Sequence, residues 1–190
     1  MQKALPAALF AMLASPALAH TGHGDVGGFL HGLVHPVLGA NHLLAMLAVG
    51  LWSGFVVPTR FWLGAAVFLG AMTAGAVVAW AGTGFPLVET VIAASVVVFG
   101  LLTSVSRRGQ AGWLTVSSLA IISAFALAHG HAHATEAAGN AFAYLSGFLI
   151  ATAALHLVGI GLARSVASRP RIQGALGAGI TLSGIVLLAG

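Results

Sequence analysis

Cysteine is absent from this chain of 190 residues, and charged side chains are scarce. Without cysteine the chain has no disulfide framework and no thiolate metal site, so metal ligands would be histidine, carboxylate, amide, methionine or backbone groups. Charged residues make up 5% of the chain, whereas soluble domains carry about 25%. Seven basic and three acidic side chains are too few to solvate a globule, so the composition excludes an ordinary soluble domain and favours lipid as solvent.

Hydrophobic residues account for 59% of the chain and occur in long runs separated by short polar breaks. A transmembrane helix needs about 20 apolar residues, so the pattern predicts an all-α membrane protein. We expect six transmembrane helices that form a single transporter domain over residues 20–190. The predicted spans are residues 28–57, 61–81, 87–105, 110–130, 137–163 and 171–189.

The first predicted span is too long for a single crossing, and Pro36 and Gly39 lie near its start. Proline removes a backbone donor and disfavours a helical conformation at the preceding residue. We therefore expect a short helix that carries His31, a break near Pro36, and the full span from about Asn41. Irregular backbone at membrane depth is tolerated where it lines a wet cavity, and transporters often bind ions at such broken helices.

Residues 1–19 have the pattern of a secretory signal peptide. Lys3 supplies the positive start, residues 4–14 are apolar, and the small-x-small pattern before a cleavage site ends at Ala19. Because the apolar stretch is too short to span a bilayer, we expect cleavage after Ala19, with His20 as the mature N-terminus. The alternative is an uncleaved first helix.

The arginines predict the orientation, because all of them lie in the first, third or fifth polar break. With six spans these breaks share one side, and the positive-inside rule makes that side cytoplasmic. The protein is then a multi-pass protein of a bacterial inner membrane, with both mature termini in the periplasm. The net positive charge of the chain reflects this topology, and the small groups of arginines argue against a nucleic-acid-binding surface. The arginines are Arg60, Arg107, Arg108, Arg164, Arg169 and Arg171.

Histidine is unusually frequent, and under this topology eight of the nine lie at or near the outer side. Imidazole suits nickel, cobalt, copper and zinc, so the histidines together with an amide or carboxylate oxygen predict a transition-metal site near the periplasmic face. The alternative is a set of hydrogen-bonded interfacial histidines. The nine are His20, His23, His31, His35, His42, His129, His131, His133 and His156.

The first histidine cluster follows helical spacing. His31 and His35 are four residues apart, as are His42 and Met46, and residues at this separation share a helix face. The mature start "HTGHGD" would add surface capture of a metal, or would be a disordered tail with incidental histidines. The residues assigned to accessory metal capture are His20, His23, His31, His131 and Met46.

The second cluster is "HGHAHATE", residues 129–136, which reads as a polar break. We expect His129 to end the fourth span and Glu136 to open the fifth, where His133 would share its first turn. His156 lies deep in the fifth span. It would belong to an ion pathway, although a lone intramembrane histidine more simply bonds to a neighbouring helix.

The stretch "HPVLGANHLLAMLAVGLW", residues 35–52, resembles the first-span motif His-Pro-x-x-Gly-x-Asp-His of the HupE/UreJ family. These proteins are bacterial nickel or cobalt permeases associated with hydrogenase and urease maturation. The resemblance covers essentially the whole chain, including the signal, the mature start, the six spans and the second motif. It implies a permease that carries Ni²⁺, or Co²⁺, and has no prosthetic group.

The resemblance also implies which residues handle the metal. His35, Asn41 and His42 match the first motif, except that the family has Asp where this chain has Asn41. Asparagine keeps a carbonyl acceptor but loses the negative charge, so weaker transport or an altered ion preference is expected. The replacement is either natural divergence or an engineered change. The residues that match the second motif less strictly are His129, His133 and Glu136.

The leading hypothesis is therefore a secondary uptake permease that is not an enzyme. The chain has no Gly-x-x-x-x-Gly-Lys-[Ser/Thr] phosphate loop, so an ion gradient, the membrane potential or cytoplasmic trapping would drive uptake. One alternative is an intramembrane zinc-dependent hydrolase, for which three acidic residues are few. Another is a non-transporting metal sensor or scaffold subunit.

Overall fold

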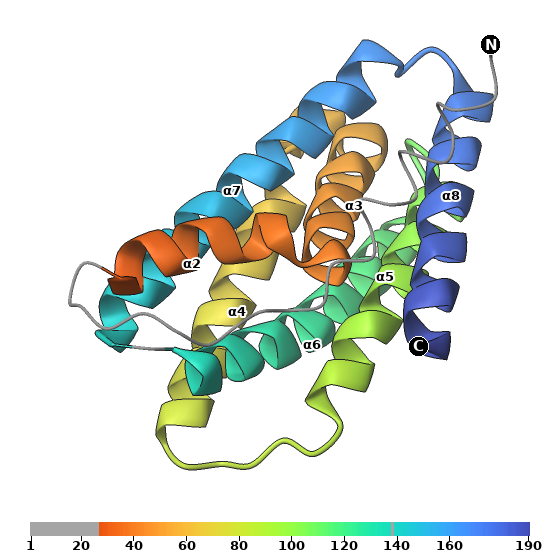
Figure 1. Ribbon diagram of the computed structural model, residues 1–190. Coiled ribbons are helices and arrows are strands. Elements are labelled where there is room, and N and C mark those ends of the chain that lie inside the picture. The colour runs from red at the N-terminus through yellow and green to blue at the C-terminus, as the bar shows by residue number, and fades with distance from the viewer. Residues whose placement is uncertain (1–26, 138) are drawn as a thin grey trace, which may run out of the picture.

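The computed structural model describes residues 27–137 and 139–190, and within these residues it contains helices and no strand (Figure 1). The predicted signal peptide, His20 and His23 lie outside the described residues. The predicted all-α class is confirmed. The helices are α2 (Gly27–Leu38), α3 (Ala40–Val56), the short 3-10 helix η1 (Pro58–Arg60), α4 (Leu63–Trp80), α5 (Val88–Val105), α6 (Gly112–Glu136), α7 (Ala141–Ser165) and α8 (Pro170–Ala189).

Five of these helices, α4 to α8, are long and apolar enough to cross a membrane, and α2 with α3 makes a sixth candidate. The axes of α2 and α3 are bent by 78° relative to each other, which confirms the expected break in the first span. The break lies at Gly39, whose backbone is extended, while Pro36 remains within α2. The Gly39 carbonyl accepts a hydrogen bond from the Leu43 N–H at 2.9 Å, which starts α3.

The predicted break over residues 129–136 is wrong, because α6 continues through this stretch and ends at Glu136. Glu136 therefore closes the fourth long helix and does not open α7. Alanine, the strongest helix former, occupies positions 128, 132 and 134, and residues 128–133 are buried. The histidines of this stretch are buried, so their polarity does not mark a surface loop.

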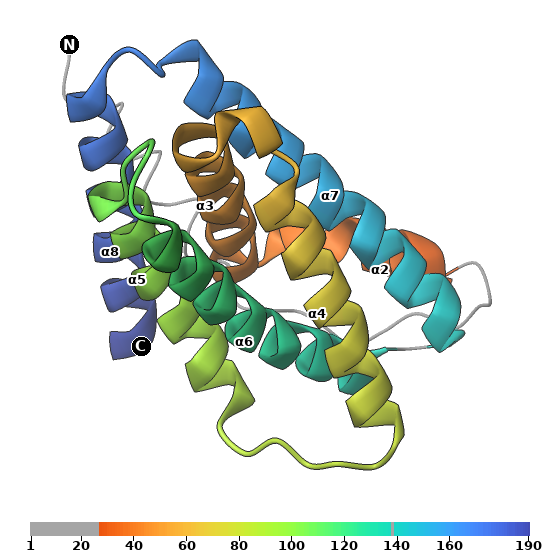
Figure 2. The same cartoon turned by 180° about the vertical axis from the view of Figure 1, so that it is seen from behind.

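Close helix contacts place α2 against α7 and α4 against α6. A Cβ atom at Gly147 would collide with the backbone carbonyl of Phe29, and one at Gly32 would collide with that of Tyr144. Small residues allow this approach between helices in lipid. Both views show α2 lying across α7 (Figures 1 and 2).

The connections form two groups at opposite ends of the bundle (Figures 1 and 2). The segment around η1, the α5–α6 connection and the α7–α8 connection share one end. There the Arg164 guanidinium lies 3.5 Å from the Pro58 carbonyl, and the Gln173 amide donates to the Ser106 carbonyl at 2.8 Å. All six arginines therefore gather at one end, as the orientation argument requires, and the α4–α5 and α6–α7 connections lie at the other.

Candidate metal site

Three histidines from three helices converge inside the bundle. His35 of α2, His42 of α3 and His133 of α6 each offer one ring nitrogen, and these nitrogens lie within 4.8 Å of one another. The ring centroids are 4.4 Å apart for His42 and His133, and 4.8 Å apart for His35 and His133. Sequence reasoning had named all three, and the structure brings them together.

The bend at Gly39 explains how two of these histidines meet. His35 and His42 are seven residues apart, which in an unbroken helix would separate them by about 10 Å along the axis. In the folded chain their ring centroids are 5.5 Å apart, because α2 turns back by 78° at this point. A local break in the backbone therefore creates the site.

Glu136 adds a carboxylate to the three imidazoles. Its Oε2 atom lies 3.6 Å from His35 Nε2 and 3.4 Å from His133 Nδ1. The Glu136 side chain is 45% exposed and that of His35 is 25% exposed, whereas His133 is 1% exposed. The site is therefore open at Glu136 and closed toward the bundle interior.

Asn41 contacts His42 through its side-chain oxygen. Asn41 Oδ1 accepts a hydrogen bond from the His42 backbone N–H at 3.0 Å and lies 2.7 Å from His42 Nδ1. When Nδ1 carries the proton and donates to this oxygen, Nε2 is left as a lone pair for a cation. Among the described residues, His42 Nε2 is buried and has no hydrogen-bond partner. In this geometry Asn41 orients the ligand; its role as a ligand remains a prediction.

His129 lies one helical turn before His133 and deeper in the bundle. It is 0% exposed, its Nε2 lies 3.0 Å from Ser95 Oγ, and its ring centroid is 5.4 Å from that of His42. It is not one of the three histidines whose nitrogens converge. His129 thus lies behind the cluster, next to His42.

The remaining predicted residues take different positions. His31 is partly buried one turn before His35, with the two ring centroids 5.8 Å apart. Met46 is fully buried one turn after His42. His131 faces away from the cluster, and its Nε2 lies 2.6 Å from the Thr83 carbonyl in the α4–α5 connection. The accessory capture role of these residues stays a prediction.

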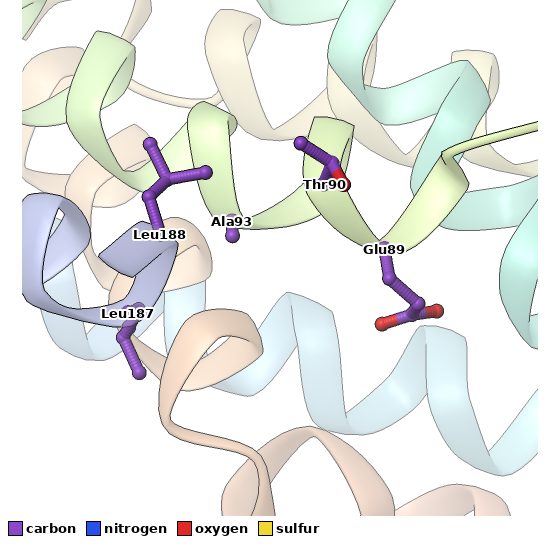
Figure 3. Close-up of a pocket in the computed structure, with 5 residues that line it drawn as sticks. All are labelled: Glu89, Thr90, Ala93, Leu187 and Leu188. Atoms are coloured by element: carbon purple, nitrogen blue, oxygen red, sulfur yellow. The ribbon is translucent and has the colours of Figure 1, made fainter. Parts of the chain in front are cut away.

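A pocket of about 200 Å³ lies elsewhere, between the start of α5 and the end of α8. Figure 3 shows Glu89 at one end of this pocket and Leu187 and Leu188 of α8 at the other. No histidine lines it. Glu89 lies in the first turn of α5, where the helix dipole favours an acidic side chain.

Three imidazole nitrogens and one carboxylate oxygen suit a borderline divalent cation such as nickel or cobalt. Imidazole nitrogens bind such ions at about 2.0–2.1 Å, so nitrogens that share one ion lie about 3–4 Å apart. The separations of up to 4.8 Å would therefore shorten on binding.

Comparison with known proteins assigns the chain to a family. The family model described as HupE / UreJ protein matches residues 8–187. The chain belongs to the HupE/UreJ family. It is similar to "Protein HupE" of Rhizobium leguminosarum bv. viciae, at 37% identity over 185 residues that cover 95% of each chain. No solved structure matches the chain.

The HupE/UreJ family comprises nickel and cobalt accessory or permease proteins and is not a family of enzymes. The predicted family is thus confirmed, together with the multi-pass membrane architecture. The ion, the transport mechanism and the sidedness of the termini belong to the proposal below.

Sequence reasoning missed two aromatic residues of α7 at the site of this HupE/UreJ protein. The Phe148 ring packs on the His133 ring, with centroids 4.0 Å apart, and the buried Tyr144 ring lies 5.4 Å from that of His31. Their four-residue spacing was the available signal. In a span that is apolar on all sides, this spacing does not show which face is turned inward.

Proposed function

We propose that this HupE/UreJ protein is a secondary permease that takes up Ni²⁺, with Co²⁺ second, across the bacterial inner membrane. The observation that carries the proposal is the convergence of His35, His42 and His133 beside Glu136, at the end of the bundle opposite the arginines. Under the positive-inside rule, that end faces the periplasm. Membership of the HupE/UreJ family supports the same function.

The arrangement supports capture from the outer side. The half-exposed Glu136 carboxylate attracts the hydrated cation, and the three imidazoles then replace water molecules around it. The inside-negative membrane potential contributes about 2.3 kcal/mol per charge for each 100 mV, roughly doubled for a divalent ion. Uptake therefore needs no nucleotide hydrolysis. A maturation context for hydrogenase or urease remains part of this proposal.

The geometry does not favour the zinc-dependent hydrolase. Such an enzyme needs an open coordination position and usually a separate general base. Among the described residues, Glu136 is the carboxylate in contact with the cluster, and it already lies within 3.6 Å of two imidazoles. A sensor or scaffold subunit would bind the ion without moving it, so flux separates that alternative from the permease.

The test is uptake of radioactive nickel by cells that lack their own nickel transporters, followed by flux into proteoliposomes. We expect the wild-type chain and its Asn41→Asp form to exceed the empty vector, and His42→Ala and His133→Ala to fall to the vector level. Ser118→Ala is the matched control, because Ser118 is also buried in α6 and bonds to the Leu114 carbonyl of its own helix. Uptake at the vector level by both the wild type and Asn41→Asp contradicts the proposal.

A further inference from the structure

Four buried residues of α7 form a stripe that leads from the outer cluster into the bundle. Tyr144, Phe148, Thr152 and His156 follow one another at four-residue spacing, which places them on one helix face. Each of the four is at most 1% exposed. Tyr144 and Phe148 are the residues that pack against the outer histidines, so the stripe begins at the metal cluster and ends at His156.

The inner half of this stripe contains polar atoms without partners. Among the described residues, neither ring nitrogen of His156 has a hydrogen-bond partner, and neither does the Thr152 hydroxyl. The equally buried Thr103 hydroxyl, in contrast, donates to the Phe99 carbonyl at 2.8 Å and has the Ala48 carbonyl as a second acceptor within reach at 3.2 Å. Buried polar groups in folded proteins are almost always paired, and an unpaired one is destabilising. Two such groups one turn apart indicate a site that receives a ligand.

Phe68 of α4 lies against both His129 and His156. Its ring centroid lies 5.6 Å from that of His129 and 5.1 Å from that of His156, and the side chain is fully buried. Both imidazoles therefore lie against one aromatic ring. An ion that moves from His129 to His156 would pass beside this ring.

We infer that Thr152 and His156 form a second, inner station for the same divalent transition-metal ion, reached from the outer cluster past Phe68. This inference rests on the proposed permease function. The inner station offers an imidazole nitrogen and a hydroxyl oxygen, fewer donors than the outer cluster, so it holds the ion more weakly. Conduction requires binding sites that are favourable enough to enter and weak enough to leave, and a weaker inner station meets this condition.

The absence of cysteine from the chain permits a direct test of access. Thr152→Cys and His156→Cys each place a single thiol in the full chain, which is exposed to Ag⁺ in membranes and then labelled with a maleimide after denaturation. We expect both thiols to react with Ag⁺, and Ni²⁺ bound at the station to slow this reaction. Thr103→Cys is the matched control, since Thr103 is equally buried but outside the stripe. Reaction at 152 and 156 no faster than at 103 overturns the inference.

A kinetic measurement separates the station from a structural role. Thr152→Val preserves the side-chain shape, and His156→Leu removes the imidazole. We expect maximal nickel uptake per folded chain to fall about tenfold in each, with the half-saturating concentration unchanged, because the outer cluster sets capture. Wild-type uptake in both variants overturns the inner station and leaves the permease intact. If Ag⁺ reaches both thiols and Ni²⁺ protects them, but the wild-type chain transports no nickel, the permease is overturned and the inner station stands.

Discussion

The side-chain oxygen of Asn41 lies 2.7 Å from Nδ1 of His42, and it also accepts a hydrogen bond from the His42 backbone N–H. The contact to Nδ1 holds the imidazole in one orientation, and the contact to the backbone N–H fixes the position of the oxygen. Ligand histidines are commonly held in this way by a carboxylate or carbonyl oxygen, which also makes the imidazole a better ligand. The asparagine therefore supplies an orienting contact but no negative charge.

Asn41→Asp should increase nickel affinity and uptake. A carboxylate would orient His42 through the same contact, strengthen the hydrogen bond and add a negative charge near the cation. Asn41→Ala removes the contact and should weaken affinity about 10- to 100-fold. Both are measured by equilibrium binding of nickel to purified protein and by uptake in cells. Equal affinity of Asn41→Ala and wild type would show that the contact does not orient the ligand.

Glu136→Gln should weaken nickel binding about 10- to 100-fold. The substitution keeps the shape of the side chain but removes the negative charge that lies 3.6 Å or less from two imidazoles. Glu136→Asp is the matched variant, because it retains the charge on a shorter side chain, and it should lose less affinity. Binding titrations at low and high salt measure the effect. Wild-type affinity in Glu136→Gln would show that the carboxylate charge does not contribute to nickel binding.

Gly39→Ala should impair metal binding more than it changes stability. A Cβ atom at this position would lie 2.9 Å from His42 Nδ1 and 3.2 Å from Asn41 Oδ1, so the pair must shift. Gly70→Ala is the control, because a Cβ atom there meets no other atom within 4 Å. Nickel affinity and the thermal unfolding midpoint are measured for both. Unchanged affinity of Gly39→Ala would contradict the tight packing at the break.

Gly147→Val should displace α2 from α7 and cost about 1–3 kcal/mol in the free energy of unfolding, as overpacking does. The added side chain would meet the Phe29 carbonyl, and the shift would move His35 away from the cluster. Gly161→Val on the same helix is the control, because a Cβ atom there meets open space. Thermal unfolding in detergent and nickel binding test both. A Gly147→Val protein with normal stability and affinity would contradict this role of the α2–α7 contact.

Composition and pattern were sufficient to predict the membrane class and the family. Scarce charge, long apolar runs and arginines confined to alternate breaks do not depend on distant contacts. The motif of residues 35–52 is likewise recognised from the order of neighbouring residues, and the break that it predicted is present at Gly39. These features were readable because each depends on neighbouring residues alone.

The tertiary structure decided which histidines act together. Successive residues of a helix point about 100° apart, so the continuation of α6 turns His133 toward His42 and His131 toward the Thr83 carbonyl. When residues 129–136 are interpreted as a polar break, nothing distinguishes the direction of the His131 side chain from that of the His133 side chain. The pairing of His35 with His133 depends in turn on the bend at Gly39 and on how closely α2 approaches α7. The sequence by itself thus determined that the chain lies in a lipid membrane and which residues are candidate metal ligands. Helix packing decided which of these candidates form the site, because the direction of a side chain depends on contacts between distant segments.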